Sequence, residues 1–176
     1  MTGPVVESTS SMVEWLSTNI SPDVKEFDYS LDYKTLDFTD FSTRKLYRIG
    51  RGEQGVLLCR PYTEDICQYW RFRDETTARK SALKIYEMFC AYARNDDFIG
   101  MDMARKFLEM GFTRARRYAN HPDGKKYAKN GKVLPQSEDA LTCEKAKSAT
   151  IFKHFRDLAA KDPEYVRMRK QWRDSE

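Results

Sequence analysis

The feature that most constrains the fold is an amphipathic pattern that runs from Met101 to His121. On a wheel of 100° per residue, most apolar residues lie in one half of the turn, and the polar and charged residues lie in the other. The apolar half consists of Ala104, Phe107, Leu108, Gly111, Phe112, Ala115, Tyr118 and Ala119. This pattern predicts one long helix with a buried stripe. Because a glycine costs roughly 1 kcal/mol in a helix interior, the alternative is two helices that meet at Gly111, with Thr113 capping the second.

Helical spacing and capping signals recur on both sides of this segment. Asp74 or Thr76 is a suitable N-cap for a helix, and Pro163 after Asp162 favours the start of another. Further helices are expected over residues 12–20, 63–69, 76–93, 137–160 and 163–172.

Residues 45–62 are predicted to form a β-hairpin. Two short strand-like runs, 46–49 and 56–59, flank the turn Gly-Arg-Gly-Glu-Gln-Gly, whose glycines permit left-handed backbone. The expected fold class is therefore α+β, with a mainly helical body of four to five helices and one small antiparallel β-hairpin.

The same turn matches the pattern G-x-G-x-x-G at Gly50, Gly52 and Gly55. A dinucleotide-binding fold needs a helix to begin there, and a strand-like run follows instead. No H-R-D or D-F-G tripeptide of a protein kinase follows either. Two interpretations stay open. The turn is purely structural, or its backbone amides approach a phosphate, with Glu53 and Gln54 directed at the same ligand.

Composition predicts a single globular domain over residues 27–176, after a tail at 1–26 that is disordered or forms a short helix. Hydrophobic residues make up 40% of the chain, which is too many for a disordered protein. An acidic-aromatic arm at 27–43 begins the domain. Residues 1–43 contain eight acidic and two basic residues, whereas residues 44–176 contain 19 acidic and 29 basic ones. A body this basic favours an anionic partner.

The sequence predicts no membrane partner and no oxidising compartment. No apolar run approaches the ~20 residues that span a bilayer, and residues 1–11 lack the features of a secretory leader. The four cysteines are scattered singly, without a C-x-x-C pair. We therefore expect reduced thiols and a cytoplasmic or nuclear protein. The oligomeric state stays open.

No metal and no cofactor is expected. The two histidines, His121 and His154, are far apart in sequence, and no Cys/His cluster has zinc spacing. Asp96, Asp97 and Asp102 have the right chemistry for Mg²⁺. Acidic residues near a helix start are more often caps, because they interact favourably with the helix dipole.

The strongest functional signal is the excess of basic residues between Met101 and Lys132, nine against three acidic ones. Arginine suits two-pronged recognition of phosphate, and aromatic rings stack on the bases of single-stranded nucleic acid. We therefore predict a polyanion-binding module whose partner is a nucleic acid or another phosphorylated ligand. The expected anion-binding residues are Arg51, Arg105, Arg114, Arg116, Arg117, Lys125 and Lys126, with Trp70 and Tyr118 as stacking residues.

Two alternatives use the same residues differently. In an enzyme acting on a phosphorylated or nucleic-acid substrate, Glu53 would be the general acid or base, His121 its partner, and the arginines would stabilise negative charge. In a structural or interaction protein without a ligand, the arginines would instead form ion pairs with the arm. The acidic partners would be Asp28, Asp32, Asp37 and Asp40.

Two stretches resemble the motifs of a known family. One is Ile49-Gly-Arg-Gly-Glu-Gln-Gly-Val-Leu-Leu, followed by Pro61-Tyr62 and Trp70-Arg71-Phe72, and the other is DDFIGMDMARKFLEMGFTRARRYANH at 96–121. The family is a domain of unknown function found in small proteins of bacteria, phages and some eukaryotes. The resemblance covers about Asp28 to Trp172. It implies no activity, because the family has none assigned.

Overall fold

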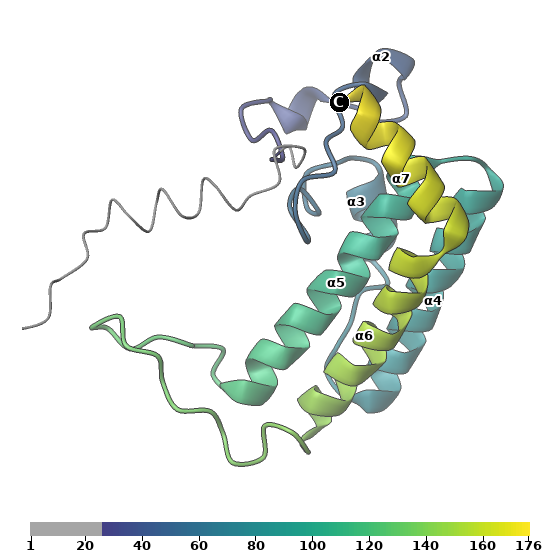
Figure 1. Ribbon diagram of the computed structural model, residues 1–176. Helices are drawn as coiled ribbons and strands as arrows, with labels where there is room; N and C mark the ends of the chain where they lie inside the picture. The colour runs from purple at the N-terminus through teal and green to yellow at the C-terminus, as the bar shows by residue number, and fades with distance from the viewer. Residues whose placement is uncertain (1–25) are drawn as a thin grey trace, which may run out of the picture.

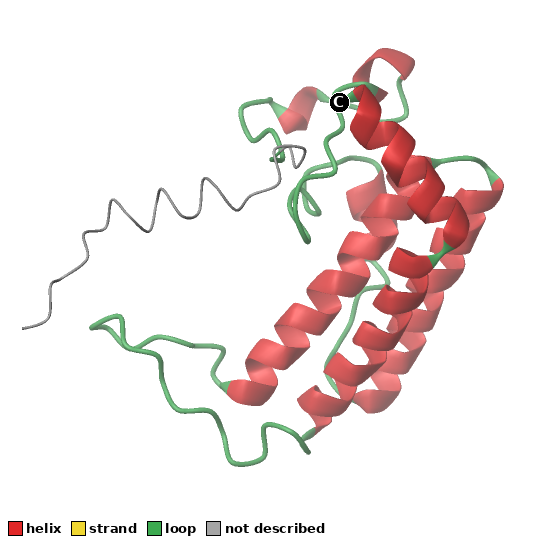
Figure 2. Cartoon of the chain, viewed as in Figure 1, coloured by secondary structure: helices red, strands yellow, loops and turns green. Residues whose placement is uncertain are grey.

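The computed structural model describes residues 26–176, so the helix predicted at 12–20 and almost all of the predicted tail lie outside the described residues. Regular structure in the described chain is helical (Figures 1 and 2). The short elements are the 3-10 turn η1 (Tyr33–Thr35) and the helices α2 (Phe41–Arg44) and α3 (Tyr62–Cys67). The longer helices are α4 (Glu75–Arg94), α5 (Phe98–Asn120), α6 (Glu144–Lys161) and α7 (Pro163–Ser175).

Helix α5 lies at the centre of the fold and packs against both α4 and α6 (Figure 1). Asp97 caps its start by accepting a hydrogen bond from the Gly100 N–H (3.1 Å). The helix continues through Gly111, so the amphipathic pattern corresponds to one helix and not two. Packing explains the glycine, because a Cβ at that position would lie 2.3 Å from Cδ1 of Phe152 on α6.

The starts of α4 and α7 agree with the predicted capping signals. Asp74 accepts a hydrogen bond from the Thr77 N–H (2.8 Å). Asp162 accepts one from the Tyr165 N–H (3.0 Å), with Pro163 as the first helical residue. Both caps satisfy backbone donors that have no partner within the helix.

Residues 121–143 form a long loop between α5 and α6, and α6 begins at Glu144 rather than at the predicted Ser137. The Ser137 side chain donates to Asp139 (2.6 Å), and its N–H donates to the carbonyl of Asn120 at the end of α5 (2.8 Å). Ser137 therefore closes the base of the loop instead of capping α6. The rest of the loop extends away from the helices (Figure 1).

The arm at 27–43 contributes rings to the core. Phe27, Tyr33 and Phe38 are buried, and their ring centroids follow one another at 5.3 and 6.0 Å. The four arm aspartates bond locally or stand at helix starts: Asp28 with Ser30, Asp32 at η1, Asp37 with Thr39, and Asp40 at α2. Within residues 26–176, no ion pair joins them to the arginines of α5.

The predicted β-hairpin over residues 45–62 is wrong, and the fold is helical rather than α+β. Residues 51–60 form consecutive turns. No β-strand is present in residues 26–176. The β-type pairing in these residues is one isolated antiparallel bridge between Tyr127 and Val133.

Two features explain why the hairpin does not form. Gly50, Gly52 and Gly55 all have positive φ, at 66°, 51° and 78°, as expected of a turn, but the turns continue through residues 56–59, so the second strand-like run is not extended. In addition, carbonyl groups of this turn accept hydrogen bonds from cationic side chains of α5 and α7, as described below. In the strand-like runs themselves, the carbonyls of Tyr47 and Val56 accept from the Trp172 indole and the Thr63 hydroxyl (both 3.0 Å), so these groups do not pair with each other's strand.

Candidate functional site: a basic cleft beside a buried ion cluster

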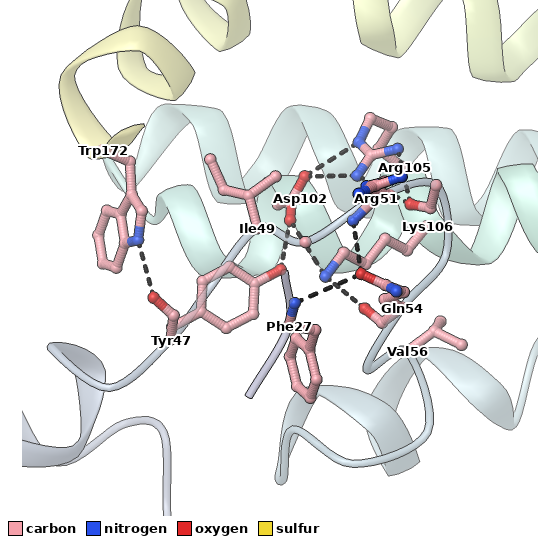
Figure 3. A network of polar contacts seen from close by, with 12 residues as sticks. Phe27, Tyr47, Ile49, Arg51, Gln54, Val56, Asp102, Arg105, Lys106 and Trp172 are labelled. Carbon is pink, nitrogen blue, oxygen red and sulfur yellow. Dashed lines mark hydrogen bonds and ion pairs between the residues drawn. The ribbon is translucent and has the colours of Figure 1, made fainter. Parts of the chain in front are cut away.

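Charged side chains are buried where α5 meets the Gly-rich turn, residues 50–55 (Figure 3). Asp102 has no exposed side-chain surface, and its carboxylate accepts from Arg105 Nε (2.9 Å) and from the hydroxyls of Tyr47 and Tyr165. The Lys106 ammonium lies 3.5 Å from the second Asp102 oxygen. We call these five residues the buried ion cluster. A buried carboxylate requires such a set of donors, because burial without them is very costly.

The buried ion cluster contains one carboxylate and two cations. Burial by itself would raise the pKa of Asp102, but the neighbouring Arg105 and Lys106 hold that pKa well below its usual range. Burial lowers the pKa of Lys106 to about 8, although the attraction of Asp102 opposes this. At neutral pH the cluster therefore has one excess positive charge, in surroundings where charges are poorly screened.

Cations of α5 and α7 also hold the Gly-rich turn by its carbonyl groups. The donors come from residues at least 50 positions away in sequence, so the conformation of the turn depends on the tertiary fold. The bonds are Arg173 to Gly50 O (2.7 Å), Arg105 to Gly52 O (3.2 and 3.3 Å) and Lys106 to Gln54 O (2.7 Å). Every second carbonyl of the turn, at residues 50, 52 and 54, thus accepts a hydrogen bond from a cationic side chain.

An open cleft of about 680 Å³ lies between the Gly-rich turn and α7. Two of its lining residues, Arg105 and Tyr165, belong to the buried ion cluster. Half of the ten lining residues are basic, and among the described residues none that lines it is acidic. The basic residues are Arg51, Arg105, Arg169, Lys170 and Arg173. We call this cavity the basic cleft.

The basic residues of the cleft differ in how far a ligand could reach them. The Arg105 side chain is only 12% exposed, whereas that of Arg51 is 47% exposed. Arg169 and Lys170 are exposed on α7. Lys170 pairs with Asp174 (3.0 Å), but that carboxylate does not line the cleft. A bound anion would therefore contact the exposed Arg51, Arg169 and Lys170 directly. Its interaction with Arg105 would be mainly long-range electrostatic attraction.

The predicted anion-binding residues lie in separate places. Arg51 and Arg105 line the basic cleft. Arg114 and Arg117 are exposed on the C-terminal half of α5, and Arg116 is committed to the carbonyl of Ala140. Lys125 and Lys126 belong to the loop that follows α5. The structure brings the first pair together and leaves the others outside the cleft.

The proposed acid–base pair is not brought together in the cleft. Glu53 accepts a hydrogen bond from the Thr113 hydroxyl (2.8 Å) and lines a different hollow, with Arg114. His121 is buried at the C-terminal end of α5. At 1.5 Å per residue, its position lies about 12 Å further along the helix axis than Thr113. The enzymatic alternative stays a prediction that rests on the sequence.

The two predicted stacking residues have different surroundings. The Trp70 indole donates to the carbonyl of Phe107 (3.1 Å) and packs on Phe72, with ring centroids 5.0 Å apart, so it belongs to the core. Tyr118 also contacts Phe72, but its ring is partly exposed beside the loop. Of the two, Tyr118 is the one that a base could reach.

The α7 cations Arg169, Lys170 and Arg173 are absent from the sequence-based prediction. With Val166 they follow the spacing i, i+3, i+4, i+7, which places them on one helix face. That spacing is visible in the sequence. It does not reveal that the face lies opposite the Gly-rich turn, because the two segments are more than 100 residues apart.

Of the three aspartates with the right chemistry for Mg²⁺, Asp96 is exposed and the other two have structural partners. Asp97 caps α5 and pairs with Arg44 (2.9 Å), and Asp102 belongs to the buried ion cluster. In residues 26–176, no three His, Cys, Asp or Glu side chains gather in a way that could hold a metal ion. None of the helices in that span has the length and apolar character needed to cross a bilayer.

The fold and the cleft define a helical domain with a basic ligand-sized cavity. The chain belongs to the family described as Domain of unknown function (DUF4385), whose model matches residues 28–175. This confirms the resemblance drawn from the Gly-rich turn and the α5 motif. No curated protein and no solved structure matches the chain.

Proposed function

We propose that this protein binds a nucleic acid, with the basic cleft as a phosphate-binding site. The observation that supports this most directly is the lining of the cleft, in which half of the residues are basic and none of the described ones is acidic. Lys and Arg that neutralise phosphates supply most of the affinity of such proteins for nucleic acid.

The buried ion cluster supports the same proposal. Its excess positive charge lies beside the cleft, where salt screens it less than a surface charge. Arg51, Arg169 and Lys170 would contact phosphate oxygens directly, because their side chains are accessible, with Arg51 and Lys170 exchanging their ion pairs with Glu26 and Asp174 for phosphate. The cluster would add a fixed positive potential without needing to move.

The distribution of charge favours a nucleic acid over a compact phosphate ligand. Exposed cations continue beyond the cleft at Arg114 and Arg117 and into the loop that follows α5. A small phosphate compound would use the cleft alone, whereas a polymer with regularly repeated phosphates can contact several of these positions.

Fluorescence anisotropy with a labelled 20-mer oligonucleotide tests the proposal. The variant Arg169→Glu/Lys170→Glu should bind about tenfold or more weakly than the wild type, because two phosphate contacts become repulsive. The matched control, Lys34→Glu/Lys80→Glu, makes the same change in charge at exposed lysines that do not line the cleft.

Binding by the wild-type protein should weaken steeply between 50 and 200 mM salt, by a factor on the order of 10³ if about six phosphates are contacted. Wild-type binding that does not depend on salt contradicts the proposal. So does an equal loss of affinity in the cleft variant and its control.

A further inference from the structure

The loop between α5 and α6 contains a short antiparallel element that projects from the helices (Figure 1). Its centre is the bridge between Tyr127 and Val133. Two hydrogen bonds flank the bridge, from Ala128 N–H to Lys132 O and from Leu134 N–H to Lys126 O, both 2.8 Å. We call residues 125–134 the basic ribbon.

The basic ribbon has a defined tip and a fixed root. At the tip, Gly131 adopts φ 83° and donates to the carbonyl of Ala128 (2.9 Å), which closes the turn. At the root, Asn120 accepts from the Ser137 N–H (2.8 Å), and Arg116 donates to the carbonyl of Ala140. The ribbon is therefore presented from the end of α5 by hydrogen bonds on both sides.

The surface of the basic ribbon combines positive charge with exposed apolar side chains. Residues 124–137 contain four lysines and no acidic residue: Lys125, Lys126, Lys129 and Lys132. Tyr127 and Val133 are 55% and 61% exposed. The two flanking hydrogen bonds make them a non-hydrogen-bonded pair, so their side chains lie close together on one face.

We infer that the basic ribbon enters a groove of double-stranded nucleic acid. The lysines would contact phosphates at the rims, and Tyr127 and Val133 would face the base edges. The major groove is about 12 Å wide, and two chain segments joined by such a bridge lie about 4.8 Å apart, so the element is narrow enough to enter it. A single strand has no groove, so the inference predicts a preference for duplex.

This inference rests on the proposed function for its class of ligand. Its site is separate, however, because the basic ribbon follows the C-terminal end of α5, whereas Arg105 of the basic cleft lies in the first half of that helix. Variants can therefore test the two surfaces independently.

The first test measures the affinity for a labelled 20-base-pair duplex and for single-stranded (dT)20 by fluorescence anisotropy. The variant Lys126→Glu/Lys129→Glu/Lys132→Glu should bind the duplex about tenfold or more weakly. The slope of its log affinity against log salt concentration should also be shallower by about 2 to 3, because three phosphate contacts are lost. The matched control is Lys34→Glu/Lys80→Glu/Lys84→Glu, at exposed positions on η1 and α4. It should lose less than about threefold, because isolated surface charges act weakly over distance.

The second test separates groove insertion from simple phosphate contact. Tyr127→Ser/Val133→Ser keeps every lysine and removes the apolar face, so duplex affinity should fall by about fivefold or more with an unchanged salt dependence. Duplex affinity equal to that of the wild type overturns groove insertion. Circular dichroism melts of all variants should match the wild type. Where the glutamates disturb folding, the three lysines are changed to glutamine instead.

The outcomes distinguish this inference from the proposed function. Equal wild-type affinity for duplex and (dT)20, or undiminished duplex binding by the lysine variant, overturns the inference and leaves the cleft to be judged by Arg169→Glu/Lys170→Glu. Failure of the wild type to bind either probe overturns both. Loss of duplex binding in the ribbon variants but not in the cleft variant supports the ribbon and overturns the cleft.

Discussion

The two halves of α5 both have cations on the polar side of the helix, but the surroundings of those cations differ. In the first half, Asp102, Arg105 and Lys106 are covered by the Gly-rich turn and α7, and each charge has an internal partner. In the second half, Arg114 and Arg117 are exposed, and the chain leaves the helix in a projecting loop. A helical wheel places the cations of both halves on one polar side.

The comparison shows that cations on one helix face can have either a structural role or an exposed position that a ligand can reach. A buried charge must be matched by partners, so the cations of the first half are part of the structure that positions the cleft. An exposed cation loses little by staying in water and remains available for a ligand. Substitutions in the first half should therefore lower stability and disturb the cleft, whereas substitutions in the second half should leave stability almost unchanged.

The largest effect is expected for Asp102→Asn. The substitution leaves two buried cations without a countercharge, which should lower the free energy of unfolding by about 3–5 kcal/mol. Urea denaturation measures this. The matched variant in the second half, Arg117→Ala, should change stability by no more than about 0.5 kcal/mol. Similar losses in both variants would remove the distinction between the two halves.

The junction between the halves is tested by Gly111→Ala. Alanine favours a helix by about 1 kcal/mol over glycine, but its Cβ would lie 2.3 Å from the Phe152 ring. Overpacking should dominate and destabilise the protein by about 1–3 kcal/mol in thermal or urea melts. A stabilised variant would show that α6 moves away at little cost.

Acid should weaken the first half through Asp102. Its folded-state pKa lies well below the ordinary value near 4, so the stabilisation is complete above that value and is lost as the pH falls below it. From this group the free energy of unfolding should fall by up to about 1.4 kcal/mol per pH unit below pH 4. Urea melts at pH 5 and pH 3 should show a smaller wild-type advantage over Asp102→Asn at pH 3. A constant advantage would mean that the two cations do not depress this pKa.

The smallest effect on stability is expected for Arg114→Ala/Arg117→Ala. Both side chains are exposed, so urea melts should stay within about 0.5 kcal/mol of the wild type. If both contact phosphates, the dependence of log affinity for the 20-mer on log salt should become shallower by about two. An unchanged salt dependence would place the ligand away from this half of α5.

The sequence predicts the helices well where the pattern is local. The starts of α4 and α7 follow from their capping residues, and the helical course of α5 follows from its apolar stripe, although the stripe alone leaves open a break at Gly111. The hairpin prediction fails because the decisive contacts are distant. Trp172 takes the carbonyl of Tyr47 in the first strand-like run, and nothing near that run in sequence indicates this.

The candidate site is predicted only in part, for the same reason. Arg51 and Arg105 belong to motifs that stand out in the sequence, and both line the cleft. The opposite wall comes from α7, whose basic face resembles any solvated helix face until the fold places it beside the turn. Likewise, the helical wheel cannot show that Lys106 is buried, because its partner Gln54 comes from another segment.

The attachment of α7 has a consequence for synthesis of the chain. Trp172 donates to the carbonyl of Tyr47 (3.0 Å), and Arg173 donates to that of Gly50 (2.7 Å), across more than 120 residues. These closures span most of the chain, so they carry the large entropic cost of long-range contacts. During translation, α4, α5 and α6 can associate while α7 is still in the ribosome. The basic ribbon would then be exposed before the basic cleft has its second wall, which α7 supplies.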